Sequence, residues 1–114
     1  MTQPTPITHS EELGLLERFQ LLTILPTEGD IVTVRIVADL RRELAVTEEE
    51  IVRYGVVQTG EQLKWNTEVD NSKSVSMGPR AMALIAQVLR GMSDKKKLTI
   101  DYLPLYERFA NEGN

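Results

Sequence analysis

The segment from residue 79 to residue 92 constrains the fold more than any other part of the chain. Pro79 follows Gly78 and suits the first turn of a helix. The helix that follows has almost no polar face, because it contains Ala81, Met82, Ala83, Leu84, Ile85, Ala86, Val88, Leu89 and Met92. Such a helix is either the central core element or one side of an interface. We expect it to form the core, with a homodimer contact if the rest of the chain leaves it uncovered.

The size of the chain favours one domain around this helix. The 114 residues are 41% hydrophobic and 26% charged, which is ordinary globular usage. We expect a globular domain over residues 9–110, with tails at 1–8 and 111–114. Because the chain has no cysteine, disulfides and thiolate metal sites are excluded.

A first helix is predicted near the N-terminus. Thr8 and Glu11 have the spacing of a capping box, and an apolar stripe follows over residues 13–25. Pro26 and Gly29 end this helix.

Residues 31–44 can be read in two ways. Alternation over residues 32–36 is typical of a strand, whereas the spacing of Ile36, Leu40 and Leu44 is typical of a helix. Asp30 can cap a helix there. We expect a helix, although residues 31–37 leave the strand alternative open.

A short third helix and a hairpin are predicted over residues 47–66. Thr47 and Glu50 form a capping box, and Glu48 to Glu50 lie in the first turn, where free backbone N–H groups favour negative charge. With Thr59-Gly60 as a two-residue turn, Val56 would pair with Leu63 and Tyr54 with Trp65. Residues 73–77 can add a short third strand.

Together these elements predict an α+β fold that is predominantly helical. It has four to five helices, the last of them short and near residues 103–110, and one small β-hairpin.

No catalytic, cofactor or metal site is predicted. His9 is the only histidine, and no nucleotide-binding or nucleophile motif is present. The acids Asp39 and Glu43 are best read as a solvated helix face, and Gly78-Pro79-Arg80 as a plain helix start instead of an anion site. We expect a protein that is not an enzyme.

Charge argues against nucleic acid and membranes as partners. The net charge is −4, with eleven acidic and six basic side chains in residues 1–66. An acidic protein has little electrostatic attraction for phosphate. Without a long apolar run or a secretory signal, we expect a cytoplasmic protein.

The order of helix, helix, short helix and hairpin over residues 11–66 resembles winged-helix domains. That resemblance implies a DNA-binding regulator that uses Arg53, Lys64 and Lys95–Lys97, with the third helix in the major groove. The glutamates of that helix depart from the pattern, since they would repel phosphate.

A second resemblance covers most of residues 13–109. The stretches "LLTILPTEGDIVTVRIVADLRREL", "LKWN" and "LPLYERF" are similar to short, largely uncharacterised proteins encoded by bacteriophages and prophages. This implies a cytoplasmic protein that acts by binding.

Our leading hypothesis is a small, acidic, non-enzymatic interaction protein that binds a protein partner through a helix–hairpin face. The residues predicted to bind are Glu48, Glu49, Glu50, Arg53 and Trp65. Tryptophan is a common binding hot spot, although packing of Trp65 against the second or the 79–92 helix is favoured. The winged-helix DNA-binding regulator is the alternative.

Overall fold

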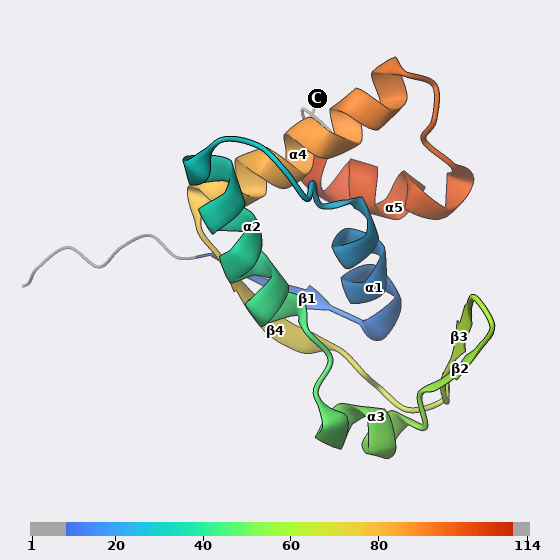
Figure 1. Ribbon diagram of the computed structural model, residues 1–114. Helices are drawn as coiled ribbons and strands as arrows, with labels where there is room; N and C mark the ends of the chain where they lie inside the picture. Colours follow the sequence, from blue (N-terminus) through green and yellow to red (C-terminus); the bar gives the residue numbers. More distant parts are fainter. Residues whose placement is uncertain (1–8, 111–114) are drawn as a thin grey trace, which may run out of the picture.

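The structure is a computed structural model that describes residues 9–110 (Figure 1). The predicted tails, 1–8 and 111–114, lie outside the described residues. The elements follow the order β1 (His9–Leu13), α1 (Leu15–Ile24), α2 (Ile31–Leu44), α3 (Glu48–Tyr54), β2 (Val57–Thr59), β3 (Gln62–Lys64), β4 (Lys73–Met77) and α4 (Pro79–Asp94). A C-terminal segment then combines a 3-10 turn (Ile100–Tyr102), α5 (Leu103–Leu105) and a π-turn (Tyr106–Ala110). The predicted α+β, predominantly helical fold is confirmed.

The first element corrects the prediction for the N-terminus. Residues that were expected to begin a helix form β1, which pairs antiparallel with β4 so that Ser10 faces Ser76 and Leu13 faces Lys73. Leu13 and Val75 on these two strands are fully buried in the core. A long-range strand partner therefore outweighs a local capping pattern, and the fold has two small sheets where the sequence predicted one hairpin.

Helix α1 begins only after Gly14. The carboxylate of Glu17 accepts a hydrogen bond from the Gly14 N–H at 2.8 Å, and the Asn71 side chain accepts one from the Leu15 N–H at 3.0 Å. These two acceptors satisfy backbone donors that a helix start leaves free. Because Asn71 is distant in sequence, the helix start depends on the loop before β4.

The helix interpretation of residues 31–44 is confirmed. The Asp30 carboxylate accepts a hydrogen bond from the Thr33 N–H at 2.8 Å and thereby caps α2. Val37, Leu40 and Leu44 are buried at helical spacing, whereas the residues that alternated like a strand lie mostly at the surface. Tertiary packing thus overrides the modest helix propensity of the β-branched residues.

Helix α4 is the central core element, as expected. Ile85, Ala86 and Leu89 are buried by α1, α2, the β1–β4 sheet and the C-terminal segment, which returns along α4 (Figure 1). Leu105 and Phe109 supply the inner side of that segment. Leu84, Val88 and Met92 on the same helix are only partly buried and line an open hollow, so a homodimer contact through α4 stays a prediction.

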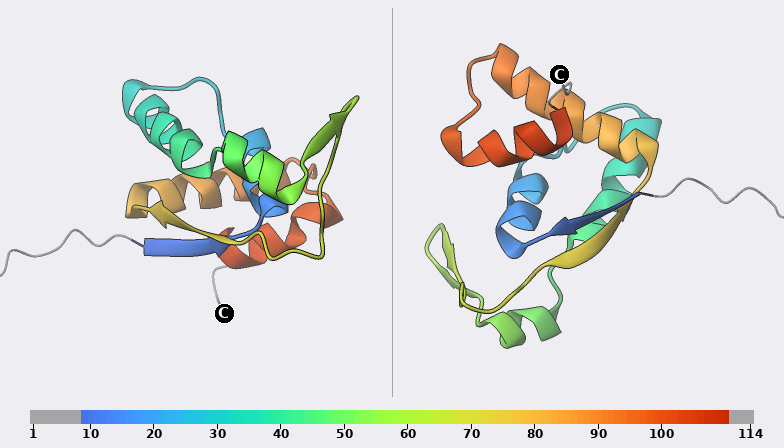
Figure 2. Two further views of the ribbon diagram at one scale, coloured as in Figure 1. Left: turned by 90° about the horizontal axis from the view of Figure 1, so that it is seen from below. Right: turned by 180° about the vertical axis from the view of Figure 1, so that it is seen from behind.

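Helix α3 and the β2–β3 hairpin extend from this body as an arm (Figures 1 and 2). We call residues 47–66 the arm. Among the described residues, the main cluster of buried apolar side chains contains none from the arm. The arm must therefore be held to the body by a small number of specific contacts.

The hairpin differs in register from the prediction. Thr59 pairs with Gln62, and Gln58 with Leu63, so Gly60 and Glu61 form the turn instead of Thr59-Gly60. Gly60 has a φ of 63°, a left-handed conformation that glycine adopts without steric cost. Placing glycine first in the turn moves the pairing by two residues and separates the expected Val56–Leu63 pair. The strand at residues 73–77 joins β1 and not this hairpin.

Candidate interaction site

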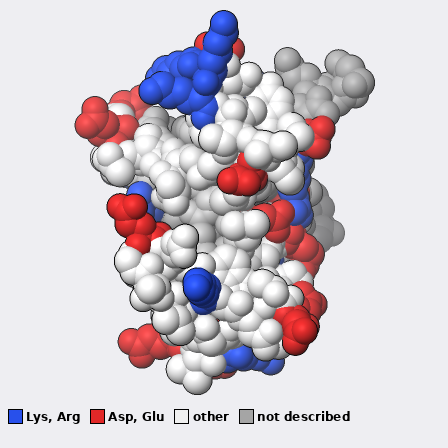
Figure 3. All heavy atoms as spheres, turned by 90° about the vertical axis from the view of Figure 1, so that its right-hand side faces the viewer, with Lys and Arg blue, Asp and Glu red and all other residues white. Residues whose placement is uncertain are grey.

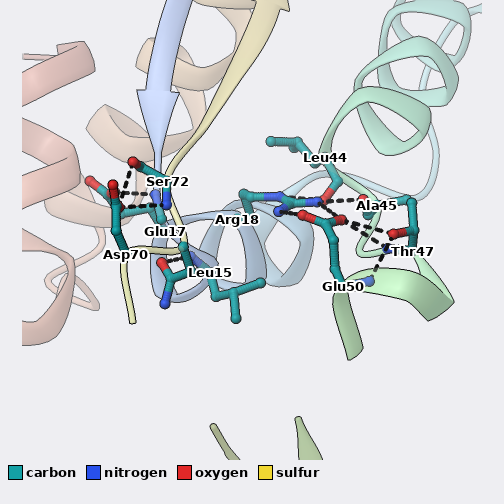
Figure 4. Close-up of polar contacts among 11 residues, drawn as sticks. Leu15, Glu17, Arg18, Leu44, Ala45, Thr47, Glu50, Asp70 and Ser72 are labelled. Carbon is teal, nitrogen blue, oxygen red and sulfur yellow. Dashed lines mark hydrogen bonds and ion pairs between the residues drawn. The ribbon is translucent and has the colours of Figure 1, made fainter. Parts of the chain in front are cut away.

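The arm is joined to the body by an arginine that is buried completely. Arg18 on α1 has no exposed surface, which is rare for a charged side chain. Its guanidinium binds the Glu50 carboxylate with two hydrogen bonds, of 2.7 and 3.0 Å (Figure 4). It also donates to the backbone carbonyls of Leu44 and Ala45, where α2 ends. One side chain therefore links α1, the end of α2 and the start of α3.

Glu50 is the acceptor at the centre of this network. The same carboxylate accepts a hydrogen bond from the Thr47 N–H at 3.0 Å, while the Thr47 hydroxyl accepts one from the Glu50 N–H. The predicted capping box is confirmed. The hydrogen bonds from Arg18 lower the pKa of Glu50 from 4.5 to about 2, against the opposing effect of burial. Glu50 is thus a structural ion-pair partner as well as a cap.

The other two glutamates of α3 are placed differently. Glu48 and Glu49 are exposed and, among the described residues, form no hydrogen bond or ion pair. Val52 lies beside them on the outer side of the helix with 82% of its surface exposed. Arg53 is also exposed, and its guanidinium lies 5.9 Å from the centre of the Tyr54 ring. The predicted binding residues therefore divide into an outward-facing group and an inward-facing Glu50.

Trp65 makes the second link between the arm and the body. Its ring lies 5.6 Å from the ring of Phe19, centre to centre, in a tilted arrangement. The ring partner is therefore on α1, whereas the sequence favoured the second or the 79–92 helix. The backbone is anchored next to it, because the Asn66 N–H donates to the Tyr54 carbonyl at 2.9 Å. Trp65 is half-buried, so part of its ring remains available at the surface.

Between these two links lies an open apolar groove of about 470 Å³. We call it the hairpin groove. Its apolar walls come from α1, the α2–α3 connection, α3 and the hairpin, and consist of Phe19, Leu22, Ala45, Val46, Ile51, Val56 and Leu63. Arg41 and Gln58 are the polar side chains that line it. Ile51 and Leu63 keep 40% and 38% of their surface exposed, so the groove presents apolar area to solvent.

The charges around the arm are mainly negative. Residues 47–72 carry six acidic and two basic side chains, and one of the acids, Glu50, is neutralised by Arg18. Figure 3 shows the side of the molecule that bears the hairpin as a largely uncharged surface with acidic groups along its flanks, a basic cluster at its upper end and a basic group within its lower half. This combination of apolar surface and acidic surroundings would attract a partner with apolar and basic groups.

The basic residues of the DNA-binding alternative are not brought together. Arg53 is at the end of α3, whereas Lys95–Lys97 follow α4. These two ends lie on opposite sides of the molecule in both front and back views (Figures 1 and 2). Lys64 belongs to β3 of the hairpin. A continuous basic surface is therefore not assembled from these residues.

The residues considered for enzymatic or ionic chemistry come together only in part. In residues 9–110, no group of three histidine or acidic side chains could hold a metal ion. Asp39 forms an ion pair with Arg42 on the surface of α2. Asp39, Glu43 and Arg80 do line one small hollow of about 190 Å³ beside the start of α4. No described helix is long and apolar enough to cross a bilayer.

Sequence reasoning missed Arg18 and Arg41. Arg18 is adjacent to Glu17 in an amphipathic stretch, and nothing local indicates that it binds a glutamate 32 positions away. One available signal was the apolar stripe itself, since Arg18 lies three residues before the buried Leu21 and therefore on the inner face. Arg41 lines the hairpin groove only because α3 and the hairpin fold back beside the end of α2, which no local pattern indicates.

No protein-family model, curated protein or solved structure matches this chain. The resemblances to bacteriophage proteins and to winged-helix domains therefore remain predictions.

Proposed function

We propose that the protein is a small, non-enzymatic interaction protein that binds a protein partner with the hairpin groove and the acidic outer face of α3. The observation that carries the proposal is the groove itself, where half-exposed apolar side chains of the arm and α1 surround a hollow that the chain leaves open. Exposed apolar surface bordered by polar residues is typical of protein-binding sites.

The partner segment is expected to carry apolar side chains, with basic residues beside them. The apolar side chains would enter the groove against Ile51 and Leu63, and the basic residues would approach Glu48 and Glu49. Apolar burial supplies most of the affinity in such an interface, while opposite charges raise the rate of association and select the partner. Glu50 contributes indirectly, because it fixes the position of α3.

The experiment compares capture of proteins from a bacterial lysate by the wild-type chain and by a groove variant. The variant Ile51→Ser with Leu63→Ser removes apolar surface from half-exposed positions and should leave folding intact. The control is Ile100→Ser, which removes an apolar side chain that is 82% exposed outside the groove. We expect a partner that is retained by the wild type and the control and lost by the groove variant.

Two results would contradict the proposal. The first is capture of the same proteins by the groove variant and the wild type, with circular dichroism confirming that both are folded. The second is salt-sensitive binding of duplex DNA in a fluorescence anisotropy titration, which would favour the regulator instead. A Glu48→Ala, Glu49→Ala variant, which keeps Glu50, tests the acidic face separately and should weaken binding of the partner with little loss of stability.

A further inference from the structure

Arg41 occupies an unusual position in the last turn of α2. On one side it lines the hairpin groove. On the other side it lines a second hollow of about 230 Å³, which Pro26 and Val34 also line. Among the described residues it forms no hydrogen bond or ion pair. It is the one charged side chain in the wall of the hairpin groove.

The described part of the chain does not supply a carboxylate to Arg41. Asp39, on the same helix, is paired with Arg42. Glu50, at the base of the arm, is held by Arg18. Glu28 lines the second hollow together with Arg41, but no ion pair joins the two side chains. The guanidinium is therefore satisfied by water as long as the groove is open.

A partner that covers the groove removes part of this water. A guanidinium taken out of water destabilises the complex unless it finds an acceptor, and its planar fork matches a carboxylate with two hydrogen bonds. We propose that Arg41 is a specificity-determining residue that binds a carboxylate on an apolar partner segment seated in the hairpin groove. This inference rests on the proposed function and defines the partner further: one acidic group inside the groove, with basic groups outside it.

Two synthetic amphipathic peptides test the inference. Both have a leucine- and alanine-rich centre and a lysine at each end, and they differ only in one central residue, glutamate in the first and glutamine in the second. Trp65 is the sole tryptophan of the chain, and its ring lies against Phe19, which lines the groove. Its fluorescence therefore reports occupation of the groove in a titration of the full-length protein.

We expect the wild type to bind the glutamate peptide about fivefold more tightly than the glutamine peptide, as an ion pair that stays partly exposed to solvent would give. Arg41→Gln should abolish this difference. The matched control is Arg35→Gln, because Arg35 is exposed on the same helix and does not line the groove. The control should retain the difference.

Equal binding of the two peptides by the wild type overturns the role of Arg41, as does a difference that survives in Arg41→Gln. Failure of both peptides to bind overturns the inference as well, because an apolar segment with this charge pattern would then not enter the groove. The lysate capture reports on the proposed function independently. Loss of the partner from the Ile51→Ser, Leu63→Ser variant would uphold that function even if Arg41 makes no contribution.

Discussion

Arg18 and Glu50 form an ion pair across 32 positions of sequence, with the guanidinium of Arg18 completely buried and the Glu50 carboxylate at the base of the arm. The side chain of Arg18 satisfies its donors with this carboxylate and with two carbonyls at the end of α2. Burial of a charge is unfavourable unless it is paired and hydrogen-bonded, so the position of α3 is coupled to the integrity of this pair.

Replacement of Glu50 by alanine should destabilise the protein strongly. The change leaves the Arg18 guanidinium buried without its counter-ion, a situation that typically lowers the free energy of unfolding by about 3 kcal/mol. Urea denaturation followed by circular dichroism measures the loss. Glu49→Ala is the matched control, because Glu49 is exposed and should change the free energy by less than about 0.5 kcal/mol. Similar losses in the two variants would contradict a structural role for the pair.

The same pair predicts how stability depends on pH. The pKa of Glu50 falls from 4.5 to about 2 on folding, because Arg18 donates to its ionised form. A group with a lowered pKa in the folded state stabilises it above the unfolded value and loses that contribution as the pH falls through the folded value. The stability advantage of the wild type over Glu50→Gln should therefore be constant above about pH 5 and should shrink steadily from there to pH 2. An advantage that grows on acidification would exclude this linkage.

Replacement of two glycines by alanine should change the stability of the protein in opposite directions. Gly91 lies within α4, and a Cβ atom there would meet no atom within 4 Å. Gly91→Ala should therefore stabilise the protein by about 0.5–1 kcal/mol, because alanine restricts the unfolded chain and favours helix. Gly55 ends α3 with a φ of 63°, which strains any side chain, so Gly55→Ala should lower stability by about 1 kcal/mol. Thermal unfolding of both variants measures the two shifts, and equal signs would contradict the backbone conformations.

Local chemistry explains which elements could be predicted. The caps at Asp30 and Thr47 and the glycine–proline start of α4 act over a few residues, and all three were correct. Strand β1 was missed because its partners in β4, from Lys73 facing Leu13 to Met77 facing His9, are distant in the sequence. The hairpin was recognised, but its register depended on which residue of the turn adopts the left-handed conformation.

The candidate site was predictable only in its outline. The sequence indicated an acidic α3 beside a hairpin, and Glu48 and Glu49 are exposed there. It gave no indication that Glu50 faces inward, because its partner Arg18 is on another helix. The hairpin groove could not be predicted from the sequence either. Its apolar walls come from four segments that become neighbours only in the folded chain.

The contact between Phe19 and Trp65 should determine how firmly the hairpin is held. Trp65→Ala removes an aromatic pair whose specific contribution is about 0.5–1.5 kcal/mol, in addition to the apolar area that it buries. We expect a lower free energy of unfolding and faster amide exchange in β2 and β3. Amides of α4 should exchange faster only by the amount that follows from the lower free energy of global unfolding. Hydrogen exchange measured by nuclear magnetic resonance distinguishes these regions. Trp65→Phe serves as the control, because it keeps a ring against Phe19 and should restore most of the protection. Equal acceleration of exchange in the hairpin for both variants would show that the stacked ring does not hold the arm.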